Sequence, residues 1–185
     1  MNHHINPLSP VLGAEVVGLD LNVPLSDAVF SEIEDAWHNA NGVLVFRGQD
    51  LAPAAQIAFS KRLGDLEVHV ATRYLLPEHP EIYRVSTKQD ANGNAMGNPE
   101  SGRYWHSDLS YLDPPAKASL LYALEVPPIG GDTMFTNMAA AHDAETLDAQ
   151  VTLLPPHEDR LWDCPLRSLQ TRIPPGMGGI GLTGR

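Results

Sequence analysis

Strand-like and helix-like segments alternate along the first part of the chain, and this alternation restricts the fold more than any other feature of the sequence. Residues 11–21 alternate loosely between apolar and polar positions, as a half-buried strand does. The apolar residues of 29–37 fall on one helical face, whereas 42–46 reads as a buried strand and Pro53 opens a second helix. The pattern predicts a mixed α and β fold in which helices pack on a sheet.

Beyond Gly64 the pattern changes to short segments of β-forming residues separated by Gly, Pro, Asn and Asp. These segments cover residues 82–86, 104–111, 118–126 and 133–136. Regular short strands with turn residues between them are typical of a β-barrel or a β-sandwich. The first part of the chain therefore leads into a predominantly β region.

The polar, glycine-rich loop over residues 90–102 directly precedes one of these predicted strands. Long loops of this kind serve either as mobile lids over a site or as exposed connections. The position of the loop favours a lid. Both interpretations stay open from the sequence.

The composition changes again after Ala144. Residues 145–185 contain two Pro-Pro pairs and a glycine-rich end, with neither helical nor strand periodicity. We expect weak structure there and divide the chain into a folded part, 1–144, and an atypical tail, 145–185. A shifted reading frame or early termination is our hypothesis for this change.

The acidic composition makes some partners improbable. The formal charge is −11, from 23 acidic and 12 basic residues, so the chain repels nucleic acid and anionic membranes. No apolar run is long enough to span a bilayer. Because Cys164 is the only cysteine and the start lacks a secretory signal pattern, we expect a reducing cytoplasm without disulfides.

His106 and Asp108 carry the clearest chemical signal in the sequence. If 104–111 is a strand, residues two apart point to the same face, and this places an imidazole beside a carboxylate. Oxygen-activating Fe(II) sites use two histidines and one carboxylate, of which this pair supplies two. A solvated pair on a surface strand is the alternative, and for the flanking Trp105 and Tyr111 we expect core packing before any pocket role.

The order of several separated segments resembles the TauD/TfdA family, named for taurine dioxygenase and 2,4-dichlorophenoxyacetate dioxygenase. The resemblance is collinear over about 140 residues. It rests on the segments 12–21, 24–27, 42–49, 59–66, 105–108 with Tyr111, Pro114-Pro115 and 124–133.

This resemblance implies an α+β fold built on a distorted double-stranded β-helix, or jelly roll, with flanking N-terminal helices. It implies that His106 and Asp108 bind Fe(II), that Thr133 contacts 2-oxoglutarate, and that His69 contacts the acidic group of the substrate. Thr133 in a simple turn and His69 as an ordinary surface histidine are the alternatives. The implied reaction uses O2 and 2-oxoglutarate to hydroxylate a small anionic molecule, such as a sulfonate, an alkyl sulfate or an aryloxy acid.

The family also uses a second histidine ligand and an arginine from its C-terminal half, which we do not find in this sequence. His142 and His157 lie in different surroundings. We expect the C-terminal part of the barrel to be missing and the chain to be truncated. Three hypotheses follow: a dioxygenase, an inactive fragment that acts as a folding or interaction module, or a structural metal-binding protein that recruits His142. A homo-oligomer is compatible with each.

Overall fold

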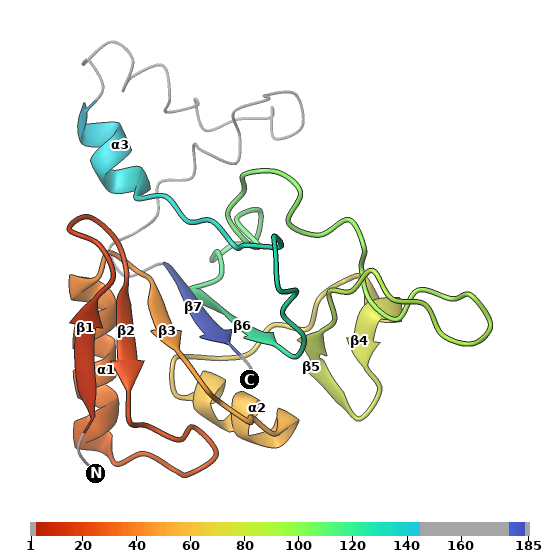
Figure 1. The fold of residues 1–185 in the computed structure, drawn as a ribbon, viewed down its shortest axis with the longest axis horizontal. Helices are drawn as coiled ribbons and strands as arrows, with labels where there is room; N and C mark the ends of the chain where they lie inside the picture. The colour runs from red at the N-terminus through yellow and green to blue at the C-terminus, as the bar shows by residue number, and fades with distance from the viewer. Residues whose placement is uncertain (1–2, 145–177, 184–185) are drawn as a thin grey trace.

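The structure is a computed structural model that describes residues 3–144 and 178–183 (Figure 1). Its N-terminal part contains β1 (His4–Pro7), β2 (Ala14–Val17), α1 (Asp27–Asn39), β3 (Leu44–Phe46) and α2 (Pro53–Lys61). The predicted alternation of strands and helices is confirmed, with a shorter first strand than expected. No helix among the described residues is long and apolar enough to cross a membrane.

The main sheet has five strands in the order β1-β2-β3-β7-β6, where β6 is Ala118–Ala123 and β7 is Gly178–Thr183. β1 runs antiparallel to β2, and the other three pairings are parallel. The strand β7 lies between β3 and β6 and separates them. The sheet therefore joins segments that are far apart in the sequence.

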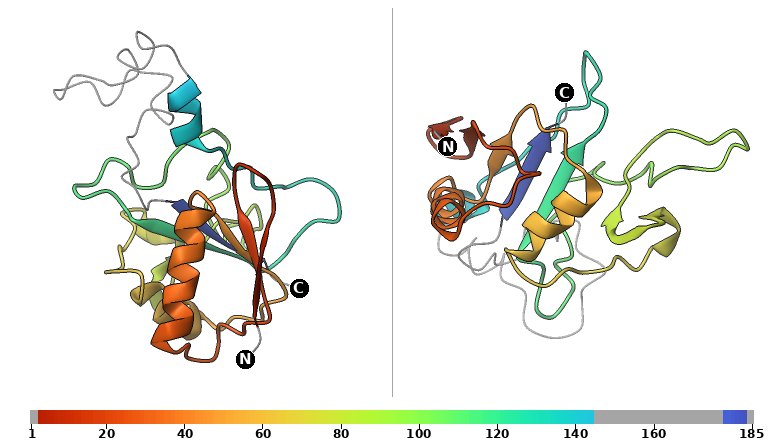
Figure 2. Two further views of the ribbon diagram at one scale, coloured as in Figure 1. Left: turned by 90° about the vertical axis from the view of Figure 1, so that its left-hand side faces the viewer. Right: turned by 90° about the horizontal axis from the view of Figure 1, so that it is seen from below.

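A smaller unit lies beside α2 at one side of the molecule (Figures 1 and 2). It consists of a short 3-10 helix at Thr72–Tyr74 and an antiparallel hairpin of β4 (Leu75–Leu76) and β5 (His79–Tyr83). The last helix, α3 (Met138–Ala144), lies outside the sheet (Figure 1). It begins near Asn137, as the sequence predicts, because the Asn137 side chain accepts a hydrogen bond from the Ala140 amide.

The boundaries of α1 follow from its terminal residues. The Ser26 hydroxyl accepts a hydrogen bond from the Val29 amide and caps the first turn. At the other end Asn41 and Gly42 adopt left-handed backbone conformations, and the Gly42 amide donates to the Trp37 carbonyl. The Trp37 indole N–H in turn donates to the Gly42 carbonyl at 2.8 Å, so a side chain of α1 stabilises the C-terminal end of the helix.

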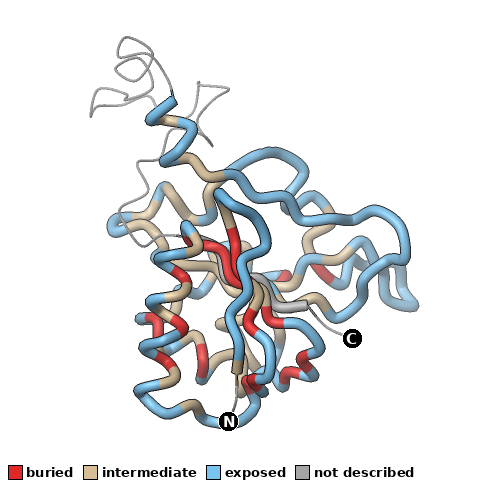
Figure 3. The backbone as a smooth tube through the Cα atoms, turned by 60° about the vertical axis from the view of Figure 1, so that its left-hand side comes forward, coloured by how far each residue is buried: buried red, intermediate tan, exposed pale blue. Residues whose placement is uncertain are grey.

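The hydrophobic core lies between α1, α2 and one face of the main sheet (Figure 3). Phe30, Ile33 and Trp37 of α1 are buried there against residues of β2 and β3. Phe59 of α2 meets both Phe30 and Phe46 edge to face, with ring centroids 5.8 and 5.9 Å apart. Such aromatic contacts add about 1 kcal/mol each to the hydrophobic gain.

Gln49 is the buried polar residue that connects the core to β6. Its amide donates to the carbonyls of Leu19 and Arg47 and accepts from the Leu21 amide at 3.0 Å. The Tyr122 hydroxyl of β6 donates to the Gln49 carbonyl and accepts from the Leu51 amide. All of these groups are hydrogen-bonded, so the polar network stabilises a defined arrangement of three chain segments.

Two of the predicted strands are absent. Residues 104–111 and 133–136 form turns and extended coil, and the strand expected at 82–86 lies instead at His79–Tyr83. The predicted strand at 118–126 is present but ends at Ala123. A strand needs a neighbour for its backbone groups, and none of the described residues pairs with 104–111 or 133–136.

Two further expectations differ from the structure. Trp105 and Tyr111 are 48% and 57% exposed rather than packed in the core, since no described element covers them. Within the atypical tail, Gly178–Thr183 forms strand β7, although we expected weak structure there. The remaining tail, residues 145–177 and 184–185, lies outside the described residues and includes Cys164 and His157.

We expect Gln49→Ala to lower the free energy of unfolding by about 2–4 kcal/mol, because it leaves several buried backbone groups without partners. Urea unfolding followed by circular dichroism measures this loss. Gln89→Ala is the matched control, since Gln89 is exposed and its side chain makes no hydrogen bond within the described residues. Equal stability of both variants would mean that water replaces the Gln49 amide at little cost.

Candidate metal centre

His106 and Asp108 lie side by side although they are not in a strand. The His106 Nε2 atom and the Asp108 Oδ1 atom are 3.0 Å apart, and the two side chains are 47% and 54% exposed. A turn over residues 108–111 follows directly. The structure thus joins the two residues that the sequence predicts as a pair, but through a turn rather than through the alternation of a strand.

The orientation of the His106 ring is fixed by its backbone. The Nδ1 atom lies 2.6 Å from the Tyr104 carbonyl oxygen, and because a carbonyl only accepts, Nδ1 must donate its proton. In the neutral ring Nε2 then carries a lone pair that faces the Asp108 carboxylate. These two atoms attract each other only when a cation lies between them, either a proton on Nε2 or a metal ion bound by both.

This arrangement fits a divalent metal ion. Donor atoms bonded at about 2.1 Å in adjacent octahedral positions lie roughly 3.0 Å from each other. Metal-binding histidines commonly donate their other ring N–H to a backbone carbonyl, which fixes the ring and its tautomer. The Tyr104 carbonyl has this role for His106. Imidazole and carboxylate together suit Fe(II) among other metals.

The backbone after Asp108 has an unusual conformation. Leu109 has a φ of 48°, in the left-handed region, which costs a residue with a side chain roughly 1–2 kcal/mol. The Leu109 carbonyl accepts a hydrogen bond from the Leu112 amide at 3.2 Å and closes the turn. Non-glycine residues in this region gather at functional sites.

No third ligand joins the pair within residues 3–144 and 178–183, where no group of three or more His, Cys, Asp or Glu residues is arranged to hold a metal. His142 lies on α3 beside Asp143, with 3.4 Å between its Nδ1 atom and the carboxylate oxygen. The hypothesis that His142 completes the site therefore has no support in the described part of the chain.

Thr133 lies in exposed coil after β6, outside any strand. Gly130 and Gly131 precede it with left-handed backbone conformations. A Cβ atom on Gly131 would lie 2.8 Å from the Pro127 ring, so this turn requires glycine. The turn and the predicted role of Thr133 are compatible, because Thr133 is exposed and a ligand can reach it.

His69 lies in coil after α2 and packs on an aromatic cluster. Its ring is 4.2 Å from that of Tyr83, which meets Tyr74 edge to face at 5.9 Å. The Nδ1 atom of His69 accepts a hydrogen bond from the Ala71 amide, so in the neutral ring the proton is on Nε2. His69 is thereby held as a hydrogen-bond donor, which suits contact with an anion.

Hydrogen bonds join part of the predicted lid loop to the segment that precedes it. The Asn98 amide donates to the Arg84 carbonyl, the Met96 amide donates to the Lys88 carbonyl, and an ion pair joins Lys88 to Glu125. A Cβ atom on Gly97 would lie 2.7 Å from the Ser86 nitrogen, so the backbone at residue 97 approaches Ser86 this closely only because residue 97 is glycine. Residues 94–98 of the loop are thus paired with residues 84–90.

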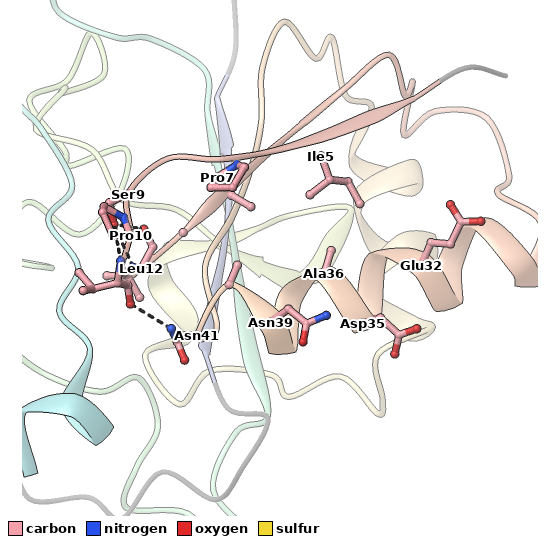
Figure 4. A pocket seen from close by; sticks show the side chains of 14 residues that line it. Ile5, Pro7, Ser9, Pro10, Leu12, Glu32, Asp35, Ala36, Asn39 and Asn41 are labelled. Atoms are coloured by element: carbon pink, nitrogen blue, oxygen red, sulfur yellow. Dashed lines mark hydrogen bonds between the residues drawn. The ribbon is translucent and has the colours of Figure 1, made fainter. Parts of the chain in front are cut away.

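A separate groove of about 640 Å³ lies between β1, the 9–13 loop and α1 (Figure 4). At one end the Asn41 side chain donates to the Val11 carbonyl at 3.0 Å. None of the predicted site residues lines this groove. The His106–Asp108 pair is therefore an exposed surface feature of the described residues rather than the wall of this groove.

Comparison with known protein families shows which family this chain belongs to. The sequence profile described as "Taurine catabolism dioxygenase TauD, TfdA family" matches residues 4–150. This chain belongs to the TauD/TfdA family. The predicted resemblance is confirmed, and the match includes His69, His106, Asp108 and Thr133.

Curated relatives carry related names. The alpha-ketoglutarate-dependent 2,4-dichlorophenoxyacetate dioxygenase of Cupriavidus pinatubonensis is 40% identical over 159 residues, covering 80% of this chain and 54% of the relative. The (S)-phenoxypropionate/alpha-ketoglutarate-dioxygenase of Sphingobium herbicidovorans is 36% identical over 152 residues, covering 81% and 51%. The chain thus spans about half the length of the curated relatives it matches.

Solved structures agree with the family assignment. A taurine dioxygenase from Burkholderia xenovorans is 28% identical, with a TM-score of 0.60, and the match covers 82% of this chain and 51% of that chain. The mixed α and β architecture of the described residues is therefore the architecture of part of a TauD-type dioxygenase.

Sequence reasoning missed three contributors to the candidate site. The Tyr104 carbonyl is a backbone group without a sequence signal, and the left-handed Leu109 has none either, because leucine is not a residue that favours this conformation. Tyr83, which packs on His69, had a weak signal, since it is an aromatic residue in a predicted strand. The contribution of each of these three groups depends on the folded conformation of the chain, which the residue types alone do not reveal.

In the turn over residues 90–94, hydrogen bonds lower the pKa of Asp90 below its ordinary value, chiefly the one from the Asn94 side chain. Asp90 therefore stabilises the loop above its unfolded-state pKa, and this contribution is lost as the pH falls through the lowered value. We expect Asn94→Ala to raise the pKa of Asp90 in an NMR titration of its carboxyl carbon. Asn92→Ala should leave it unchanged, since only the Asn92 backbone amide contacts Asp90; equal shifts would contradict the assignment.

Proposed function

We propose that this chain carries the iron-binding segment of an Fe(II)- and 2-oxoglutarate-dependent dioxygenase. The observation that carries the proposal is the His106–Asp108 pair, held 3.0 Å apart with the His106 ring oriented by a backbone carbonyl. Membership of the TauD/TfdA family supports it. In the whole protein we infer a distorted double-stranded β-helix, of which the described sheet forms one part.

Each predicted residue has a separate role in this proposal. His106 and Asp108 bind Fe(II), which when bound supplies the oxygen chemistry coupled to 2-oxoglutarate. Thr133 donates its hydroxyl proton to a carboxylate of 2-oxoglutarate. His69 donates from Nε2 to the acidic group of the substrate, and its stacking on Tyr83 keeps that N–H oriented. The third metal ligand comes from outside the described residues.

The substrate we propose is a small aryloxy acid. Relatives at 40% and 36% identity are named for 2,4-dichlorophenoxyacetate and (S)-phenoxypropionate, which share an aromatic ring and a carboxylate. A relative from Pseudomonas putida named as a sulfate ester dioxygenase is 31% identical. His69 suits either anion, so sulfate esters and sulfonates such as taurine are the second choice. A homo-oligomer and a cytoplasmic location stay predictions.

An inactive fragment that acts as a folding or interaction module is the alternative. The two-donor site among the described residues is compatible with it, because each missing ligand weakens metal binding and loosens the geometry. The family match and the prearranged pair favour the dioxygenase. A third ligand is the property that separates the two.

We expect anaerobic titration with Fe(II) and 2-oxoglutarate to give a saturable visible charge-transfer band. His106→Ala and Asp108→Ala should abolish the band or weaken Fe(II) binding by about 10- to 100-fold, since each removes a ligand. His142→Ala is the matched control and should leave the band unchanged. No band in the unmodified chain would support the inactive fragment, and loss of metal binding in His142→Ala would support the structural metal site instead.

For an active preparation we expect succinate formation with 2,4-dichlorophenoxyacetate to exceed that with taurine. His69→Ala should raise the KM for the aryloxy acid by about tenfold, the value of one hydrogen bond to a charged group, with a smaller effect on kcat. His79→Ala, a histidine at the start of β5, is the control. A KM unchanged by His69→Ala would remove His69 from the substrate site.

A further inference from the structure

The His69 ring belongs to a connected series of contacts that ends in the loop of residues 90–102. His69 stacks on Tyr83 with ring centroids 4.2 Å apart and an interplanar angle of 33°. The hydroxyl of Tyr83 in turn accepts a hydrogen bond from the Asn98 side chain, with 2.8 Å between Nδ2 and the hydroxyl oxygen. Each step of this series is a direct contact, so Asn98 is joined to His69 through a single ring.

Hydrogen bonds to both the backbone and the side chain of Asn98 fix the direction of its amide group. The backbone N–H donates to the Arg84 carbonyl, and the backbone carbonyl accepts from the Ser86 amide. The side-chain Oδ1 atom accepts from the Glu100 amide at 3.0 Å. Because a backbone amide only donates, Oδ1 is the atom that faces Glu100 and Nδ2 is the atom that faces Tyr83. The Tyr83 hydroxyl is therefore the acceptor in this contact.

The contact matters for His69 because the Tyr83 ring is the surface on which His69 packs. Tyr83 ends β5, and its ring meets Tyr74 edge to face at 5.9 Å. Tyr83 and His69 are both half-buried, so neither ring is enclosed on all sides. The hydrogen bond from Asn98 holds the far end of the Tyr83 side chain. Two contacts then set the direction of the His69 Nε2–H group, namely the bond from the Ala71 amide to Nδ1 and the face of the Tyr83 ring.

We propose that Asn98 is a positioning residue, which holds the Tyr83 ring against His69 and thereby directs the His69 Nε2–H group toward the substrate anion. The inference rests on the proposed function for its last step, since substrate contact by His69 belongs to that proposal. Asn98 lies in the same connection, between β5 and β6, as His106 and Asp108. One segment of the chain thus carries both proposed metal ligands and the residue that orients the proposed substrate contact.

The first measurement is NMR of the metal-free chain, in which the ring current of Tyr83 displaces the resonances of the His69 ring protons. Asn98→Ala removes the donor, whereas Tyr83→Phe removes the acceptor and keeps the stacked ring. We expect each variant to move the His69 resonances toward those of an exposed histidine. The double variant should move them no further, since both changes break the same hydrogen bond. Asn92→Ala is the matched control, because within the described residues only the backbone amide of Asn92 makes a hydrogen bond.

Unchanged His69 resonances in both single variants would overturn the inference. A double variant whose displacement equals the sum of the two single displacements would overturn it as well, because Asn98 and Tyr83 would then act independently. If Asn98→Ala does not fold, Tyr83→Phe makes the comparison alone, since it leaves the backbone and side chain of Asn98 in place.

The second measurement is the dissociation constant for 2,4-dichlorophenoxyacetate, obtained by NMR titration of the purified chain. We expect Asn98→Ala to weaken binding by about three- to tenfold, the range for one lost hydrogen bond, but by less than about twofold in a chain that already carries His69→Ala. An equal effect of Asn98→Ala in both chains would contradict a positioning role. If the unmodified chain does not bind this acid, the proposed substrate contact fails, and the His69 resonances alone still decide whether Asn98 orients the ring.

Discussion

The buried amide of Gln49 is the interaction on which the arrangement of the described residues depends. It binds the segment after β2 to the segment after β3, and the backbone carbonyl of the same residue accepts a hydrogen bond from Tyr122 of β6. β6 follows the loop that contains His106 and Asp108 and precedes the coil that contains Thr133. Buried polar groups around Gln49 thus help to place β6, which lies between the loop of His106 and Asp108 and the coil of Thr133, and apolar contacts alone would specify this arrangement less sharply.

The pair of His106 and Asp108 is organised locally, in contrast to the core. His106 is oriented by a carbonyl two residues earlier, and Asp108 lies between that histidine and the turn at Leu109. The neighbouring Tyr104, Trp105 and Tyr111 are exposed in the described residues. The pair is held by its own local contacts and enclosed by none of the described elements.

The sequence correctly predicted those elements whose own side chains form the hydrophobic core. The periodicity of Phe30, Ile33 and Trp37 marks α1 because these side chains form the core directly. The strand predicted around His106 is wrong, since a strand also needs a paired neighbour, which periodicity does not reveal. The juxtaposition of His106 and Asp108 was nevertheless predicted correctly, because two residues so close in sequence meet in several backbone conformations. The strand β7 was missed, as its glycine-rich sequence has no strand pattern and its pairing with β3 and β6 defines it.

The place of β7 between β3 and β6 has a consequence for synthesis of the chain on the ribosome. The strand that joins the two halves of the sheet is translated long after both of its neighbours. Until it emerges, β3 and β6 have unpaired edges, and such edges are where newly made chains aggregate or pair incorrectly. The nascent chain therefore has an extended period in which the centre of its sheet is without the strand that pairs β3 and β6.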